Sequence, residues 1–309
     1  MMFKKYNIYI LLLTVVSLLA VGLEVLLRAQ YGLGKTLLFT DSKEYEYIAA
    51  PNQDLVRFGN KVLVNEYGMR SLKIEPSDTT VILLIGDSVI NGGVLTDHDS
   101  LATTILEKEL SQESQREVRV LNISAGSWGP DNCYAYLEKH GVFNADMVVL
   151  VASSHDAHDN MEFKNIVGVH ASYPTEQPMS AVSEFFSRYV WSRYVKKNRN
   201  NAGQGQTMIN KEGKSFNTGF GDLKRLTDSL NIPFTIYLHP ERKEVKNGAY
   251  NQQGNEIVSF AHSNNIQVLE ALSFWNEQYY RDQIHPNCQG QRQIADLLKP
   301  LILEKLNEY

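Results

Sequence analysis

Short apolar, β-branched runs alternate with segments of helical apolar spacing from residue 81 onward, and this alternation constrains the fold more than any other feature. Val81–Ile85 and Met147–Ala152 are apolar throughout, and the first run meets a turn at Gly86. Such runs predict strands buried on both faces, as in a parallel sheet covered by helices. Further strands are expected at Val118–Leu121, Phe234–Leu238 and Gln267–Leu269, and helices at Leu101–Leu110, 131–140 and 289–306.

The expected fold class is therefore α/β: a three-layer α/β/α sandwich with a central parallel sheet, flavodoxin-like, over residues 81–309. Residues 160–220 interrupt the alternation and are predicted to be an insertion. Within it, the aromatic stretch Phe185–Tyr194 is expected to be helical, and the polar tract Lys196–Gly213 is expected to be a loop. In sheets of this kind ligands bind at the carboxyl ends of the strands.

The N-terminus carries a long apolar run. No charged residue occurs from Ile8 to Leu23, and the run continues to Leu27 with only Glu24 interrupting it. About 20 such residues cross a bilayer as a helix. The run is longer than that of a cleaved signal peptide, and no clear small-residue cleavage site follows it. Residues 7–28 are therefore predicted to be an uncleaved transmembrane anchor.

Charges around this run predict its orientation. Lys4 and Lys5 precede it, so the positive-inside rule places the N-terminus in the cytoplasm and the remaining chain outside, in the periplasm of a Gram-negative cell. Glu24 and Arg28 are four residues apart on one helical face and are expected to pair. Residues 29–80 are mixed and polar, and they are predicted to form a membrane-proximal stalk with a small hairpin.

Composition excludes some functions and leaves others open. The formal net charge of −5 and the pI of about 5.9 provide no basic surface for nucleic acid. Cys133 and Cys288 are too few for a disulfide framework, although both are expected near one rim of the sheet, so a disulfide between them stays open. No nucleotide-binding loop or cofactor motif is present, and the oligomeric state cannot be predicted.

Two short motifs could carry chemistry. Gly86-Asp87-Ser88 directly follows the first core strand, where a serine hydroxyl would be presented at the strand's carboxyl end. Asp282 and His285 lie three residues apart before the last helix. A serine becomes a good nucleophile when an imidazole takes its proton, and a carboxylate orients that imidazole. Taken alone, each motif also fits a plain capped turn.

Together, and in this order, the motifs resemble the SGNH, or GDSL-type, hydrolases over about residues 80–306. The resemblance implies that Ser88 is the nucleophile, His285 the base and Asp282 its orienting acid. It also implies an oxyanion hole made by the Ser88 backbone N–H and a glycine N–H in the loop Asn122-Ile123-Ser124-Ala125-Gly126-Ser127-Trp128-Gly129. Spacing to Asn122 favours Gly126, whereas the pairing of glycines three apart favours Gly129.

One block departs from the family pattern. Where the family usually has Gly-x-Asn-Asp, this chain has Ser153-Ser154-His155-Asp156. A neutral imidazole has one N–H donor, so His155 is predicted to replace the asparagine as the third oxyanion donor. The alternative is a solvated loop histidine.

Other polar residues at this rim are expected to be less important. Asp156, His158 and Asp159 lie close together, but acidic and histidine residues on one loop are commonly just polar surface, so no metal site is predicted. His239 ends a predicted strand. It could touch substrate, although a capped strand end is the simpler interpretation.

Three functions fit these features. The first is a serine esterase that removes an acyl group, such as acetyl, from an extracytoplasmic glycan or another ester, without a cofactor. The second is an O-acyltransferase that moves the acyl group onto an envelope or exported polysaccharide. The third is a catalytically weak glycan-binding module, which the intact Ser–Asp–His set disfavours.

Overall fold

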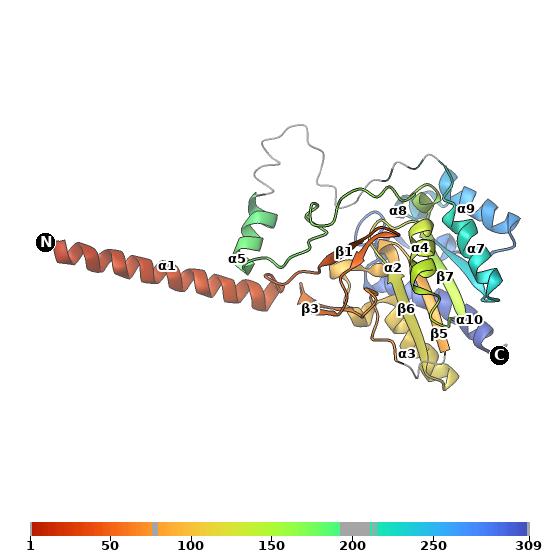
Figure 1. The fold of residues 1–309 in the computed structure, drawn as a ribbon, viewed down its shortest axis with the longest axis horizontal. Helices are drawn as coiled ribbons and strands as arrows, with labels where there is room; N and C mark the ends of the chain where they lie inside the picture. The colour runs from red at the N-terminus through yellow and green to blue at the C-terminus, as the bar shows by residue number, and fades with distance from the viewer. Residues whose placement is uncertain (1, 76–79, 192–210, 212, 214, 308–309) are drawn as a thin grey trace.

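The computed structural model describes residues 2–75, 80–191, 211, 213 and 215–307. Helix α1 (Met2–Tyr31) projects from a compact α/β body, which begins at β5 (Figure 1). Within α1, the segment Ile8–Tyr31 has a mean hydropathy of 2.7, and it is long and apolar enough to cross a membrane. A signal sequence has the same properties, so the anchor and its orientation stay predictions.

The core of the body is a five-stranded parallel sheet in the order β6-β5-β7-β8-β9. This order is that of flavodoxin-like sheets, so the predicted fold class is confirmed. All five predicted strands are present and extend slightly beyond the predicted ends. Their bounds are β5 Thr80–Gly86, β6 Val118–Ser124, β7 Met147–Ser153, β8 Phe234–His239 and β9 Gln267–Glu270.

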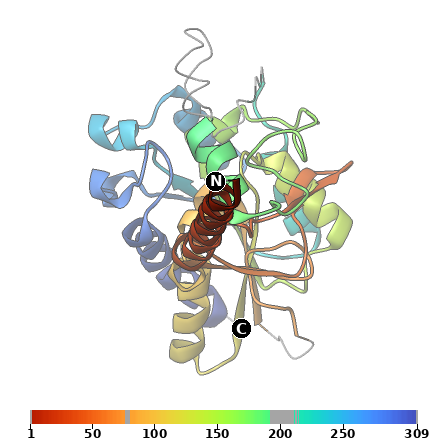
Figure 2. The same cartoon turned by 90° about the vertical axis from the view of Figure 1, so that its left-hand side faces the viewer.

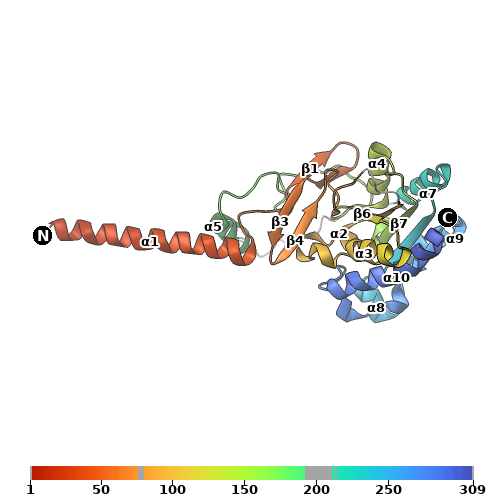
Figure 3. The same ribbon diagram turned by 90° about the horizontal axis from the view of Figure 1, so that it is seen from below.

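Helices cover both faces of the sheet (Figure 3). One face packs against α3 (Ala102–Ser114) and α10 (Cys288–Asn307), whose apolar side chains share a core with Ile82 and Leu84. The other face packs against α4 (Pro130–His140), α7 (Gly219–Ser229) and α9 (Gln252–Ser263), whose side chains share a core with Leu83 and Ile85. Successive β5 side chains therefore point to opposite layers. Two short helices, α2 (Ser88–Asn91) and α8 (Arg242–Asn247), follow β5 and β8.

The segment that was predicted to be membrane-proximal contains two hairpins where one was predicted. The first pairs β1 (Phe39–Ser42) with β2 (Glu46–Ala49), and the second pairs β3 (Gln53–Arg57) with β4 (Asn60–Val64). The segment packs directly on the α/β body: the indole N–H of Trp128 donates to a β2 carbonyl oxygen at 2.8 Å.

The aromatic stretch Phe185–Tyr194 is helical, as predicted, up to Trp191, and its last three residues lie outside the described residues. The helix comprises α5 (Ala181–Glu184) and a π-helical continuation, Phe185–Trp191, and α5 lies beside the end of α1 (Figures 1 and 2). The Glu24 carboxylate accepts the N–H groups of Ala181 and Val182, both at 2.9 Å, and thus caps α5. Glu24 also pairs with Arg28 at 2.6 Å, as predicted. Most of the predicted loop 196–213 lies outside the described residues.

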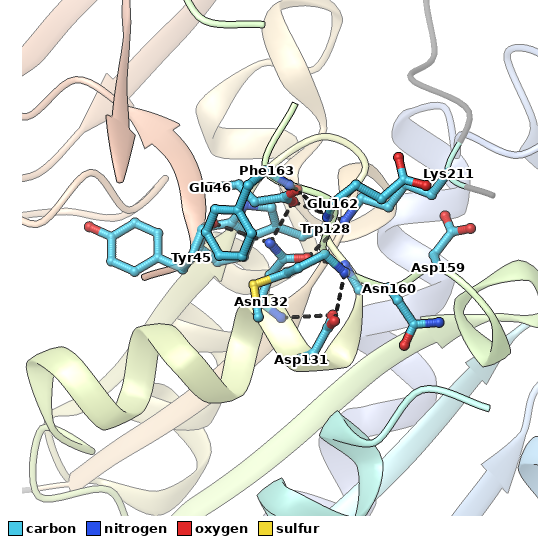
Figure 4. Close-up of polar contacts among 12 residues, drawn as sticks. Tyr45, Glu46, Trp128, Asp131, Asn132, Asp159, Asn160, Glu162, Phe163 and Lys211 are labelled. Atoms are coloured by element: carbon cyan, nitrogen blue, oxygen red, sulfur yellow. Dashed lines mark hydrogen bonds and ion pairs between the residues drawn. The ribbon is translucent and has the colours of Figure 1, made fainter. Parts of the chain in front are cut away.

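A buried ion pair attaches this insertion to the body (Figure 4). Lys211 Nζ lies 3.0 Å from Glu46 and 2.9 Å from the side-chain oxygen of Asn132. The other oxygen of Glu46 accepts the N–H groups of Glu162 and Phe163, both at 2.9 Å. The ion pair therefore joins β2, the first turn of α4 and two separate parts of the insertion.

Both cysteines are free. Cys133 is buried in α4, where its pKa is raised well above the usual value by burial, and Cys288 is exposed at the start of α10. The disulfide that the sequence left open is not formed.

Candidate active site

Ser88 lies where the first core strand ends. Strand β5 ends at Gly86, and Ser88 begins the short helix α2. The Asp87 carboxylate caps this helix, since its Oδ1 accepts the Val89 N–H at 2.8 Å. Gly86 is required by space, because a Cβ there would lie 2.4 Å from the Val151 carbonyl oxygen of β7. The tight β5–β7 contact and the cap together place the serine hydroxyl at the carboxyl end of the sheet.

The structure brings the three predicted triad residues together. His285 Nε2 lies 3.0 Å from Ser88 Oγ, and His285 Nδ1 lies 2.7 Å from Asp282 Oδ2. Both distances are within hydrogen-bond reach. With Nδ1–H donating to the carboxylate, Nε2 can accept the serine proton. This is the arrangement that general-base activation of a serine requires.

Hydrogen bonds keep Asp282 ionised. Burial favours the neutral acid, but three donors outweigh it: the His285 ring and the backbone N–H groups of Ile284 and His285, at 2.9 and 2.8 Å. Together they hold the Asp282 pKa well below its usual range. The carboxylate is therefore available to stabilise an imidazolium at His285.

A second histidine, His239, contacts the loop that carries Asp282 and His285. It is fully buried at the end of β8, and its Nε2 lies 2.9 Å from the Ile284 carbonyl oxygen. Trp275 and Tyr280 pack on its ring, with centroids 4.4 and 5.7 Å away. Burial lowers the His239 pKa to about 4, so the ring is neutral and Nε2–H donates. The structure thus gives His239 a loop-positioning contact, which the sequence did not predict.

The two candidate oxyanion glycines differ in their surroundings. The Gly129 N–H is buried and donates to the Asn132 side chain at 2.8 Å, so it is already occupied. Gly126 is partly exposed, and its N–H has no acceptor among the described residues. Its carbonyl oxygen is fixed by the hydroxyls of Tyr47 and Tyr173, at 2.6 and 3.3 Å. These contacts favour Gly126.

His155 faces carboxylates rather than open solvent. Its Nδ1 lies 3.1 Å from Glu241 Oε1, and its Nε2 lies 3.5 Å from Asp87 Oδ2 and 3.7 Å from Asp156 Oδ1. Asp87 Oδ2 is itself 3.4 Å from Ser88 Oγ. In this conformation both ring nitrogens face acids, so the predicted oxyanion role would require another rotamer. Glu241 was not among the predicted site residues, and its only signal was its place just beyond a strand end.

Burial and mutual charge interactions shift the pKa values of His155, Asp156 and Asp87. Burial opposes a charge on His155, but the neighbouring carboxylates outweigh it and raise the His155 pKa well above its usual value. Burial, together with the negative charge of Asp87, raises the Asp156 pKa. Burial also opposes ionisation of Asp87, but His155 and the Val89 N–H keep the Asp87 pKa low.

The other polar residues of the loop after β7, His158 and Asp159, contact other parts of the protein. His158 Nε2 pairs with Glu256 of α9 at 2.9 Å, away from His155. The Asp159 carbonyl oxygen accepts the Asn217 side-chain amide at 2.7 Å. Of Asp156, His158 and Asp159, only Asp156 belongs to the cluster that His155 forms with Asp87.

Comparisons with known proteins give structural similarity only. No protein-family model matches the chain, and no curated protein matches it. Among solved structures, the psychrotrophic esterase EstA from Pseudoalteromonas sp. is 15% identical, with a TM-score of 0.42 over 74% of this chain and 98% of EstA. The acetyl xylan esterase AlAXEase is 16% identical, with a TM-score of 0.42 over 72% of this chain and 99% of that one.

A third similar structure comes from Veillonella parvula DSM 2008. It is 13% identical, with a TM-score of 0.40 over 73% of this chain and 99% of that one, and it is described as a member of the lipolytic protein G-D-S-L family. Two of these three similar structures are thus described as esterases and the third as a lipolytic protein of the G-D-S-L family.

Proposed function

We propose that this protein is a serine ester hydrolase that acts through an acyl-Ser88 intermediate. The observation that carries the proposal is the continuous hydrogen-bonded chain from Ser88 Oγ through His285 to Asp282, with distances of 3.0 and 2.7 Å. A serine hydrogen-bonded to an imidazole, which is in turn hydrogen-bonded to a carboxylate, is arranged for nucleophilic attack on a carbonyl carbon.

The proposed reaction has two halves. Ser88 Oγ attacks the ester carbonyl while its proton passes to His285 Nε2. The tetrahedral intermediate collapses when His285 returns that proton to the leaving alcohol, which leaves an acyl-serine ester. Water then attacks this ester with His285 as base, and the acid and free Ser88 are released. No cofactor enters either half.

The negative charge that develops on the carbonyl oxygen needs donors. We assign this role to the backbone N–H groups of Ser88 and Gly126. The Ser88 N–H belongs to the first turn of α2, where N–H groups have no partner within the helix. The free N–H of Gly126 and the occupied N–H of Gly129 support the choice between the two glycines.

For the substrate, we propose an acylated, in particular acetylated, glycan or a related ester outside the cytoplasm. The apolar segment Ile8–Tyr31 of α1, preceded by Lys4 and Lys5, supports a catalytic domain held close to the outer side of a membrane. Such a position favours polymers of the cell envelope over freely diffusing cytoplasmic esters.

The test uses the full chain in detergent with a small chromogenic acetyl ester, followed by acetylated polysaccharides. Hydrolysis that depends on Ser88 supports the esterase, and release of acetate from a polysaccharide supports the glycan substrate. An unacetylated glycan acceptor, added with an acetyl donor, tests transfer. Accumulation of acylated glycan instead of free acid would replace the hydrolase proposal by an acyltransferase. No turnover of any ester would favour the binding module.

A further inference from the structure

Next to the triad, three potential metal ligands converge from two strand ends. Asp87 follows β5, and His155 and Asp156 follow β7. One ligand atom from each, namely Asp87 Oδ2, His155 Nε2 and Asp156 Oδ1, lies within 4.8 Å of both others. The two contacts to Nε2 measure 3.5 and 3.7 Å. Ligands around one zinc-sized ion are roughly 3.0–3.5 Å apart, so a small inward movement would complete the site.

Each of the three side chains is oriented through its other polar atom. Asp87 Oδ1 accepts the Val89 N–H at 2.8 Å, and Asp156 Oδ2 accepts the Ser153 N–H at 2.7 Å. His155 Nδ1 lies 3.1 Å from Glu241 Oε1. Metal-binding histidines typically donate their second N–H to a carboxylate in this way, which fixes the tautomer and directs the other nitrogen to the ion.

One atom of this group lacks a hydrogen bond that its burial demands. Asp156 is only 2% exposed, and its Oδ1 has no hydrogen-bond partner among the described residues. His155 Nε2 lies 3.7 Å from it, which is too far for a hydrogen bond. A buried carboxylate oxygen without a hydrogen-bond donor is costly, whereas a cation would satisfy it.

The charges of the group point the same way. Three carboxylates, those of Asp87, Asp156 and Glu241, surround one imidazole. Two of these acids, Asp87 and Asp156, are buried, and a buried carboxylate is costly unless a cation or hydrogen-bond donors compensate its charge. The single imidazole can compensate only one of them. A divalent ion would allow both buried acids to be ionised.

From these observations we infer that Asp87 Oδ2, His155 Nε2 and Asp156 Oδ1 bind a divalent transition-metal cation, with Glu241 orienting the histidine. One imidazole and two carboxylates suit Zn²⁺ or Mn²⁺ better than Ca²⁺ or Mg²⁺, which prefer oxygen ligands alone. Since the bound ion takes the lone pair of Nε2, His155 does not serve as an oxyanion donor in the loaded protein. Ser88 is not a ligand, although its hydroxyl lies 3.4 Å from Asp87 Oδ2, so metal binding and ester hydrolysis are measured separately.

The experiment measures binding directly. The full chain in detergent is stripped with a chelator and titrated with Zn²⁺, Mn²⁺ and Mg²⁺ by calorimetry, and the bound metal is counted by mass spectrometry. We expect one Zn²⁺ or Mn²⁺ per chain and weaker Mg²⁺ binding. Asp156→Asn and His155→Gln should each weaken binding by more than tenfold, and Glu241→Ala by about 10- to 100-fold. Co²⁺ added to the stripped parent should give visible absorption that His155→Gln abolishes.

Two controls make the result specific. His158→Gln removes a histidine that also pairs with a carboxylate, Glu256, but outside this group, and it should bind metal as the parent does. Ser88→Ala should also bind normally, so failure of the esterase and failure of the metal site are distinguishable. Circular dichroism checks that each variant is folded. The inference is overturned if the folded parent binds no Zn²⁺ or Mn²⁺, or if Asp156→Asn and His155→Gln leave the affinity unchanged.

Discussion

His239 Nε2 lies 2.9 Å from the carbonyl oxygen of Ile284, the residue directly before the proposed base His285. This hydrogen bond connects the end of β8 to the loop that carries Asp282 and His285. Because the histidine is fully buried under Trp275 and Tyr280, it restrains the loop from inside the protein.

Replacing His239 by phenylalanine should therefore lower kcat for ester hydrolysis by about tenfold and change KM little, since loss of one hydrogen bond of about 1.4 kcal/mol would relax the His285 position. His239→Gln should recover part of the loss, because its amide can donate to Ile284. Steady-state kinetics of both variants are the measurement. Equal activity of the parent and His239→Phe would show that the loop needs no such restraint.

Burial of His239 also predicts a pH dependence of stability. Its pKa falls from 6.5 to about 4 on folding, so the unfolded chain binds more protons between these values. The free energy of unfolding should then decrease as pH falls from about 6.5 towards 4, with His239 contributing up to about 3 kcal/mol of that decrease.

Urea unfolding at several pH values tests this effect. His239→Phe should flatten the acid side of the profile, whereas a phenylalanine at the exposed His262 should leave it as in the parent. An unchanged slope in His239→Phe would contradict the neutral, buried state of the ring.

The buried pair Lys211–Glu46 should contribute far more to stability than an exposed pair. Both side chains are at most 5% exposed, so Lys211→Met would leave the Glu46 charge buried without its cation and cost about 3–5 kcal/mol. The exposed pair Lys139–Glu44 is the matched control, and Lys139→Met should cost about 0–1 kcal/mol. Chemical unfolding compares the two variants, and similar losses would argue against the attachment of the insertion that Figure 4 shows.

Lys4 and Lys5, which precede the apolar segment of α1, predict that the body lies outside the cytoplasm. Protease added to spheroplasts should digest residues 30–309 while a cytoplasmic marker protein stays intact. A reporter enzyme that is active only in the periplasm should be active when fused to the C-terminus, and one that is active only in the cytoplasm should be inactive there. Protection of the chain from protease would contradict the predicted orientation and place the body in the cytoplasm.

The sheet was predictable from sequence because its strands are short, continuous apolar runs such as Met147–Ser153, whose burial on both faces leaves little choice of structure. Helices α7 and α9 were not predicted. Each carries only a few apolar residues, for example Phe220 and Leu223 in α7, and they are buried only once the sheet is formed. Helical apolar spacing is present in α7, at Phe220, Leu223 and Leu226, but Gly219 and Gly221 in its first turn disfavour a helix in the isolated chain.

The candidate site likewise has a part that was predictable from sequence and a part that depends on tertiary packing. The order of Ser88, Asp282 and His285 predicted the candidate triad because the motif of the family that the chain resembles prescribes that order. The surroundings of His155 could not be predicted, since Glu241 and Asp87 reach it from the ends of other strands. Which carboxylates meet one imidazole depends on tertiary packing and rotamers, and no spacing along the chain encodes it.

Labelling of Ser88 by a fluorophosphonate probe tests the central proposal most directly. The full chain in detergent is incubated with the probe, digested and mapped by mass spectrometry. The account predicts one adduct, on the peptide that contains Ser88. Ser88→Ala should remove the adduct and lower esterase activity by about three orders of magnitude or more without changing the fold. The exposed Ser259→Ala should label like the parent. An unlabelled but folded parent, or a Ser88→Ala variant that keeps its activity, would contradict the account.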